Sequence, residues 1–145
     1  MKRRHSDIEQ LLFGTNYSVF LADYSGETMN QMSLNDNVSR LIGDPVKVGG
    51  SFPVTADEIN EEIRRCISYK GDDSHGPVDM NAKKGIVDKW IEEYLSWINR
   101  ICDGSTMITQ FWLKDGHPAY PVFWDYAYFI EQNNSSHILI GSSSD

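Results

Sequence analysis

The sequence PVFWDYAYFIEQNNSSHILIGSSSD, residues 121–145, decides the fold class that we predict for this chain. Its first half is rich in aromatic residues, which favour strands, and Asn133-Asn134-Ser135-Ser136 then predicts a turn. His137–Gly141 returns as another strand. Asp115-Gly116, ahead of this stretch, is the strongest hairpin signal in the chain. We therefore expect Val122–Gln132 to be the middle strand of a three-stranded antiparallel meander.

The side chains of this middle strand divide into two unlike faces, because successive residues of a strand point to opposite sides. The first face is mainly aliphatic, and we expect it to meet the helices. The second face carries rings with polar tips, which suit interfaces and ligand pockets, although a second core layer would have the same composition. The first face consists of Phe123, Asp125, Ala127 and Phe129, with Ile138 and Ile140 from the returning strand, and the second of Trp124, Tyr126, Tyr128 and Ile130, with His137 and Leu139.

Helical patterns occupy the first hundred residues. Thr55-Ala-Asp-Glu58 is a capping box, in which the Thr hydroxyl accepts from the third helical amide and the Glu side chain reaches back. An apolar stripe that includes Cys66 follows it. Ser6-Asp7-Ile8-Glu9 predicts a weaker capping box of the same kind. The longest helix is predicted over residues 82–102, and its wide apolar face indicates cover on more than one side.

Two further segments complete the predicted architecture. Tyr17–Tyr24 is expected to extend the sheet as a strand, and the glycine- and proline-rich segment Asp44–Pro53 is predicted to be a loop. A length of 145 residues suits one domain. The prediction is thus an α+β fold in a single globular domain, residues 1–145. In it, an antiparallel C-terminal β-meander of three or more strands packs against helices from the N-terminal two-thirds.

The charge of the chain narrows the classes of partner. The formal net charge is −8 at pH 7, so nucleic acid and anionic membranes would be repelled and we expect neither. A basic protein is favoured, or the charge serves solubility alone. From Asp115 to the end the chain has four acidic residues and no Lys or Arg. Asp115 and Glu131 are therefore candidates for attracting a basic partner.

The N-terminus carries charge without a long apolar run, which is not typical of a signal peptide. No stretch approaches the 18 apolar residues of a membrane span. We therefore expect a cytoplasmic protein. In that compartment Cys66 and Cys102 would stay reduced, and their places on apolar stripes predict buried thiols.

Few residues suggest a catalytic or metal-binding role. Asp125 lies on the aliphatic face, where burial would favour its neutral form; catalytic acids are made in this way, but so are paired structural carboxylates. A Ser/His/Asp set could be assembled from Ser142–Ser144 with His117 or His137, but no nucleophile motif is present and a terminal serine run usually frays. The Asp72–His75 loop matches no metal-ligand spacing, so we expect neither a metal nor a cofactor.

Three hypotheses about function follow. The first is a protein-binding domain that neutralises a basic partner, as immunity proteins and antitoxins do with cationic toxins; this is an analogy of class, since no family is identified. The second is a small-molecule-binding domain with an aromatic-lined pocket, and the third is a small enzyme that uses Asp125 and a histidine. The predicted partner- or ligand-binding residues are Trp124, Tyr126, Tyr128, Asp115, Glu131 and His137.

Overall fold

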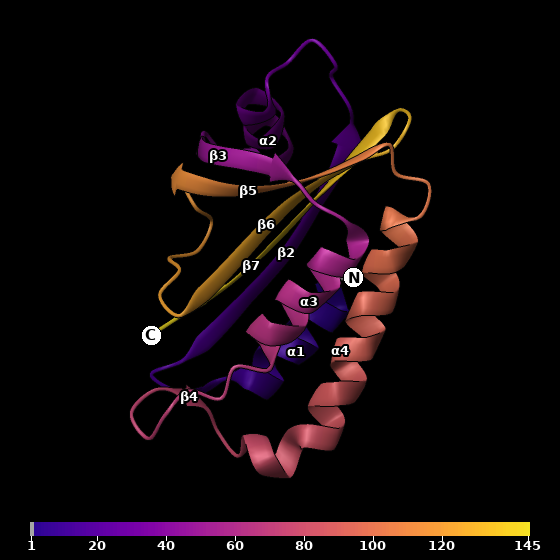
Figure 1. The fold of residues 1–145 in the computed structure, drawn as a ribbon. Coiled ribbons are helices and arrows are strands. Elements are labelled where there is room, and N and C mark those ends of the chain that lie inside the picture. Colours follow the sequence, from indigo (N-terminus) through magenta and orange to yellow (C-terminus); the bar gives the residue numbers. More distant parts are fainter. Residues whose placement is uncertain (1) are drawn as a thin grey trace.

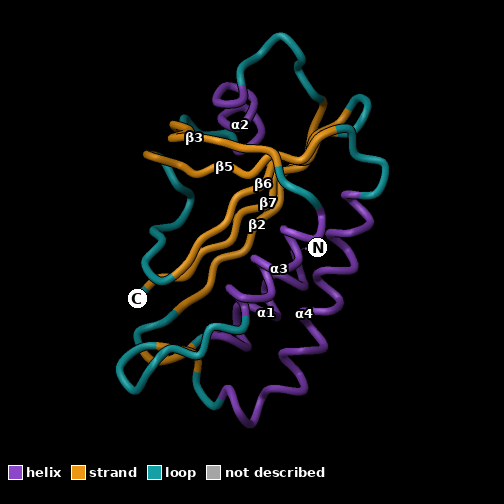
Figure 2. The backbone as a smooth tube through the Cα atoms, in the orientation of Figure 1, coloured by secondary structure: helices purple, strands orange, loops and turns teal. Residues whose placement is uncertain are grey.

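The computed structural model describes residues 2–145, with side chains from Arg4 onward, and it has the predicted α+β fold (Figure 1; Figure 2). An antiparallel sheet of five strands has the order β2-β7-β6-β5-β3. A short strand pair, β1 with β4, closes a loop beside it. The strands are β1 (Gly14–Thr15), β2 (Ser18–Glu27), β3 (Lys47–Pro53), β4 (Gly76–Pro77), β5 (Met107–Asp115), β6 (Trp124–Glu131) and β7 (Ser135–Ser144).

The C-terminal meander is confirmed, since β6 lies between β5 and β7. The second turn is a two-residue connection through Asn133-Asn134, closed by the amide of Gln132, which donates to the carbonyl of Ser135 over 2.8 Å. The strand that follows is longer than predicted. Ser142–Ser144 does not fray, because Ser142 and Ser143 pair with both β2 and β6 and Ser144 pairs with β2.

The prediction of a hairpin at Asp115-Gly116 is wrong. Strand β5 pairs with β6 only over Met107–Gln110, and its remainder pairs with β3. Residues 116–123 then cross back to β6 as an irregular segment. The strand β3 itself falls in the segment predicted to be a loop. Its two glycines are required there because the Trp112 ring lies over them, and a Cβ atom at Gly50 would come within 2.1 Å of that ring.

Four helices lie on the two faces of the sheet. As Figure 1 shows, α1, α3 and α4 gather on one side of the sheet and α2 lies apart from them beside β3. The capping box of α3 is confirmed, with Thr55 and Glu58 making both reciprocal bonds. That at Ser6 is wrong because the helix begins earlier, and Glu9 instead accepts from the amide of Leu21. The helices are α1 (Lys2–Leu12), α2 (Leu34–Ile42), α3 (Ala56–Ile67) and α4 (Met80–Cys102).

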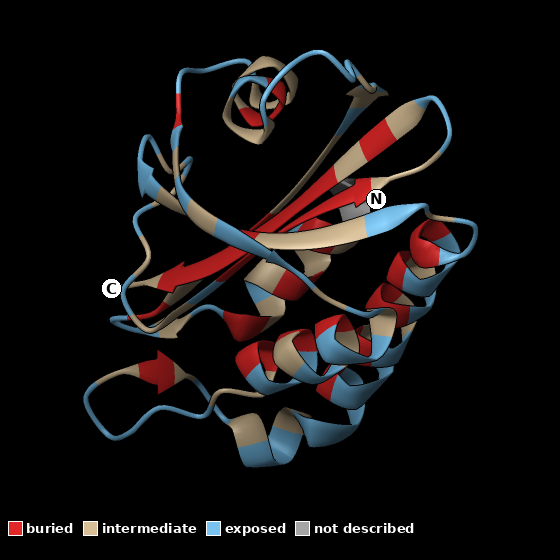
Figure 3. Ribbon diagram, turned by 45° about the horizontal axis from the view of Figure 1, so that its top comes forward, coloured by how far each residue is buried: buried red, intermediate tan, exposed pale blue. Residues whose placement is uncertain are grey.

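The assignment of the two sheet faces is the reverse of the prediction. The ring-bearing face packs under α1, α3 and α4, and the aliphatic face packs under α2. Figure 3 shows the buried residues concentrated along the middle strands and the inner sides of these helices. The rings can be buried because their polar tips bond one another: the hydroxyls of Tyr94 and Tyr126 are 2.8 Å apart, and the Trp124 indole donates to Tyr17 over 2.8 Å.

The shapes of the side chains also favour burying the ring-bearing face under α1, α3 and α4. Gly141 pairs with Tyr126, and a Cβ atom there would come within 2.3 Å of the tyrosine ring, so the ring lies across the glycine. The smaller side chains of the other face suit the thinner layer under the short helix α2. Cys66 and Cys102 are buried free thiols, as predicted. Burial raises their pKa values, to about 12 for Cys66 and about 11 for Cys102.

Candidate binding site

The predicted aromatic anchors are not an exposed surface. Tyr126 and Tyr128 are buried in the main core, under α3 and α4. Trp124 is half-buried at the start of β6, where its ring stacks on Tyr126 with centroids 6.1 Å apart. Phe123 precedes the strand and packs against the same core, not against the α2 layer. Of the predicted rings, Trp124 is therefore the one that can meet a partner without unfolding.

The predicted polar residues lie far apart along the sheet. Asp115 ends β5 and is exposed opposite Lys47. Glu131 ends β6 at the opposite end of that strand from Trp124, beside the turn to β7. His137 is half-buried beyond this turn, and burial lowers its pKa. The structure does not bring these three together with Trp124 into one site.

The enzyme hypothesis expected Asp125 to be buried, and this is wrong: Asp125 is exposed near the start of β6, in the part of the strand that does not pair with β5. Its charge reaches His117, where it partly offsets the burial that lowers the pKa of that histidine. The Nδ1 atom of His117 accepts from the amide of Ala119. Ser142, which pairs with Asp125 across the strands, has a buried hydroxyl without a partner. Among the described side chains, no hydrogen bond joins these groups into a catalytic set.

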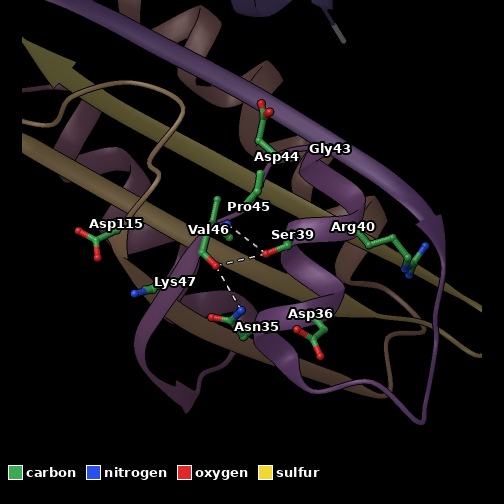
Figure 4. A pocket seen from close by; sticks show the side chains of 10 residues that line it. All are labelled: Asn35, Asp36, Ser39, Arg40, Gly43, Asp44, Pro45, Val46, Lys47 and Asp115. Atoms are coloured by element: carbon green, nitrogen blue, oxygen red, sulfur yellow. Dashed lines mark hydrogen bonds between the residues drawn. The ribbon is translucent and has the colours of Figure 1, made fainter.

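A surface hollow of about 740 Å³ lies where α2 meets the start of β3. Figure 4 shows Asn35 and Ser39 turned toward the backbone of Val46, just before the strand. Asn35 donates to the carbonyl of Val46 over 3.2 Å, and Ser39 bonds both the amide and the carbonyl of Val46. These groups hold the edge strand in place. The hollow, which also includes Asp115, thus uses much of its polar chemistry internally.

A second pair of hollows follows the outer side of α3, and we call the two together the α3 groove. They share Glu62 and Arg65, so they adjoin each other. The first hollow, of about 610 Å³, is lined by Glu58, Glu61, Glu62, Arg64, Arg65, Ser68 and Gln110. The second, the Trp124 hollow, of about 380 Å³, is lined by Glu62, Arg65, Cys66, Tyr69, Phe123, Trp124 and Asp125.

The aromatic wall of the Trp124 hollow is held rigid from behind. Tyr69 and Phe123 pack with centroids 5.7 Å apart, and both pack on Tyr17. Tyr17 in turn accepts from the Trp124 indole. Burial raises the pKa of Tyr17 to about 12, so its hydroxyl stays protonated at neutral pH. The rings therefore offer a preformed apolar surface beside charged groups.

The charged wall of the groove comes from one face of α3. Glu62 and Arg65 form an ion pair there, and the Cys66 thiol lies 3.8 Å from the Glu62 carboxylate. The sequence analysis did not identify Glu62 or Arg65 as candidate site residues, since alternating charges on a helix are typical of a solvated face. A signal was available: Glu62 stands four residues before the buried Cys66, so it borders the apolar stripe.

The groove offers carboxylates, guanidinium groups and rings, but within the described part of the chain no three His, Cys, Asp or Glu side chains lie together as a metal site requires. None of the described helices is long and apolar enough to cross a membrane. Comparisons with protein-family models, with curated proteins and with solved structures found no match. Any function of the groove must therefore be inferred from the residues that line it.

Proposed function

We propose that this chain is a protein-binding domain for a basic partner, of the immunity or antitoxin kind, and that the partner docks along the α3 groove. One observation carries the proposal. Four carboxylates and a wall of rings line the two adjoining hollows of this groove, in a chain whose formal net charge is −8. Interfaces combine such charges, which guide the approach, with aromatic side chains, which supply contact area. The four carboxylates are those of Glu58, Glu61, Glu62 and Asp125.

The arrangement also favours a protein over a small molecule. The Trp124 hollow is a surface hollow that adjoins the rest of the groove, and Tyr126 and Tyr128, which would have lined a closed pocket, are buried. Trp112 adds a half-exposed ring on the same face of β5 as Gln110, which lines the groove. A macromolecular surface can cover all of these at once. We further propose a cytoplasmic location, where the two buried thiols stay reduced.

The test begins with the basic proteins encoded beside the gene. We expect one of them to be toxic to a host cell when expressed alone and harmless when this chain is expressed with it. Binding of the purified pair should weaken with added salt, since attraction between exposed charges is screened over about 8 Å at physiological ionic strength. A toxic neighbour that this chain neither binds nor neutralises would contradict the proposal.

Charge variants then locate the docking surface. Glu58→Lys and Glu61→Lys should slow association more than they speed dissociation. Asp44→Lys is the matched control, because Asp44 is an exposed carboxylate in the hollow beside α2. Stopped-flow measurement of both rate constants separates the surfaces. If Asp44→Lys or Asp115→Lys slows association and the α3 variants do not, docking occurs at the α2 hollow instead.

A further inference from the structure

Strand β2 forms one edge of the sheet, and part of its backbone has no partner (Figure 1). It pairs on one side only, with β7, in an unbroken antiparallel register over its 10 residues. The amide of Leu21 donates to the Glu9 carboxylate over 3.1 Å, so this amide points away from β7. Because the bonding direction alternates along an antiparallel strand, the backbone groups of Asp23, Ser25 and Glu27 point outward as well.

The unpaired part of this edge is bounded at both ends. Glu9 occupies the amide of Leu21, and Arg40 donates to the carbonyl of Glu27 over 2.6 Å. Between these two bonds, no described group bonds the outward amides and carbonyls of residues 23 and 25. Ser25 is exposed. A row of unpaired backbone groups of this kind is a template for another strand.

The opposite edge of the sheet, strand β3, is protected against such pairing. The amide of Val54 bonds the carbonyl of Ile108 over 3.0 Å, so by the same alternation Ser51 and Pro53 face outward. Pro53 has no N–H to offer, and the register of β3 shifts on either side of Val48. Prolines and bulges are devices by which proteins protect sheet edges. The middle of β2 has neither device.

The charges of β2 indicate what kind of strand can pair with it. Asp23 and Glu27 lie two residues before and after Ser25, and the strand contains no Lys or Arg. His5 lies 3.6 Å from Asp23, but burial lowers the pKa of His5, so this histidine is neutral at pH 7 and does not cancel the carboxylate charge. A strand that pairs at Ser25 therefore meets two carboxylates, and opposite charges across paired strands attract.

The same charges disfavour a second copy of this chain. Two copies of β2 related by a two-fold axis would pair antiparallel. An axis at Asp23, Ser25 or Glu27 sets a carboxylate of one copy directly opposite a carboxylate of the other, and an axis between these positions sets the carboxylates diagonally. Like charges in such positions are destabilising, and each copy also has a formal net charge of −8. A basic occupant avoids both costs.

We propose that the edge of β2 takes up an extended basic segment of another protein as an additional strand, with main-chain bonds at Ser25 and with Lys or Arg side chains opposite Asp23 and Glu27. Strand β7 separates β2 from β6, which carries Trp124. This surface is therefore distinct from the α3 groove, and the inference goes beyond the docking proposed there and does not depend on it.

The probe is an acetylated, amidated octapeptide of alternating Lys and Thr, compared at low salt with an octapeptide of alternating Glu and Thr. Binding is followed by NMR and by amide hydrogen exchange. We expect the lysine peptide to slow exchange of the Ser25 amide, which is unpaired in the protein alone, and the glutamate peptide to have no effect. Exchange of the Tyr24 amide, which β7 already pairs, should not change.

Three variants locate the bound peptide. Ser25→Pro removes an outward amide without breaking a bond to β7, and prolines are tolerated on edge strands, so binding should be lost. Ser51→Pro makes the same change at the outward position of β3 and is the matched control, which should bind as the wild type does. Glu27→Lys leaves the backbone unchanged and should weaken binding about tenfold at low salt.

Thermal melts show whether the proline variants fold, and Glu27→Lys decides the question if Ser25→Pro does not. The proposal is wrong if the lysine peptide leaves exchange of the Ser25 amide unchanged, or if Glu27→Lys binds as tightly as the wild type. Loss of binding in Ser51→Pro alone would place the peptide on β3 and also overturn it. A dimer in sedimentation that Ser25→Pro dissociates would make a second copy the occupant. The charge variants of α3 test the proposed function separately.

Discussion

The two faces of one sheet carry two unlike layers, and strand β7 shows the contrast residue by residue. Leu139 points under α1, α3 and α4, into a layer of large rings and branched side chains. Its neighbour Ile140 points the other way, into a smaller layer under α2 and the turn into β3. Both residues are fully buried. The two residues are therefore equally buried, although the elements that bury them are very different.

The difference lies in the helices that cover each layer and in where their polar side chains bond. The layer under three helices is closed by elements of 11, 12 and 23 residues, and its edge is the α3 groove. The layer under α2 is closed by a helix of nine residues, whose polar side chains bond the backbone of its own edge strand. The first layer supports the rigid ring wall at which we propose that a partner docks. The second uses its polar groups to keep the sheet edge in place.

The largest expected effect compares Leu139→Ala with Ile140→Ala. Removing a buried branched side chain costs about 2–5 kcal/mol of unfolding free energy, depending on how far the site can collapse. Long helices should prevent collapse around Leu139, so we expect about 4 kcal/mol there and about 2 kcal/mol for Ile140→Ala, whose cover can relax. Urea unfolding measures both. Equal losses would show that the two layers are equally rigid.

The next effect compares the hydroxyls of the ring layer. Tyr94→Phe leaves the Tyr126 hydroxyl buried and unpaired, which should cost about 1–3 kcal/mol. The double variant with Tyr126→Phe removes both hydroxyls and should recover most of that loss. A double-mutant cycle by urea unfolding gives the coupling. If the losses of the two single variants simply add, the hydroxyls do not depend on each other.

The same two layers mark where sequence reasoning succeeded. The alternation along β6 and the Asn133-Asn134 turn were enough to predict the middle strand and, from Trp124 onward, which side chains share a face, because both signals are local; Phe123, which precedes the strand, was assigned to the wrong face. The capping box at Thr55 is local too, and it is confirmed. Which face the helices cover is not local. That choice depends on Tyr94 meeting Tyr126 and on Gly141 making room for a ring.

The errors have the same origin. The segment 44–53 has the composition of a loop, yet residues 47–53 form β3 because the Trp112 ring fills the space that side chains at Gly49 and Gly50 would need. Asp115-Gly116 carries a turn signal, but β5 leaves β6 before reaching it. The α3 groove depends on Glu62 and Trp124, which are 62 residues apart in the sequence and come to line one hollow only when the chain folds. No local pattern connects them.

A smaller effect compares the caps of α3 and α2. Thr55→Ala removes the hydroxyl that accepts from the Glu58 amide and donates to the Glu58 carboxylate, and should cost about 1 kcal/mol. Ser33→Ala removes a single bond, to the amide of Asp36, and should cost about 0.5 kcal/mol. Thermal melts of the two variants give the order. A larger loss for Ser33→Ala would mean that the α2 layer depends on its cap more than on its packing.

The last prediction concerns the dependence of stability on pH, and its effect appears only below neutral pH. His5 is buried against Tyr94 and Trp97, with Asp23 from β2 3.6 Å away. Burial lowers its pKa below the ordinary value of 6.5, and Asp23 offsets only part of that shift. As the pH falls through 6.5, the unfolded chain therefore takes up a proton that the folded chain resists. Unfolding free energy should be constant above this pH and decrease below it, by at most about 1.4 kcal/mol per pH unit for one proton.

His5→Gln should reduce this acid slope, whatever it does to stability at neutral pH, because the variant has no titrating group in the ring layer at that position. His137 and His117, whose pKa values burial also lowers, keep the remaining slope. His75→Gln, in the half-exposed loop before β4, is the matched control. Melting midpoints from pH 5 to 8 supply the test. A slope that His5→Gln leaves unchanged would mean that the α1 end of the ring layer opens to solvent before the protein unfolds, which would make it the weaker of the two layers.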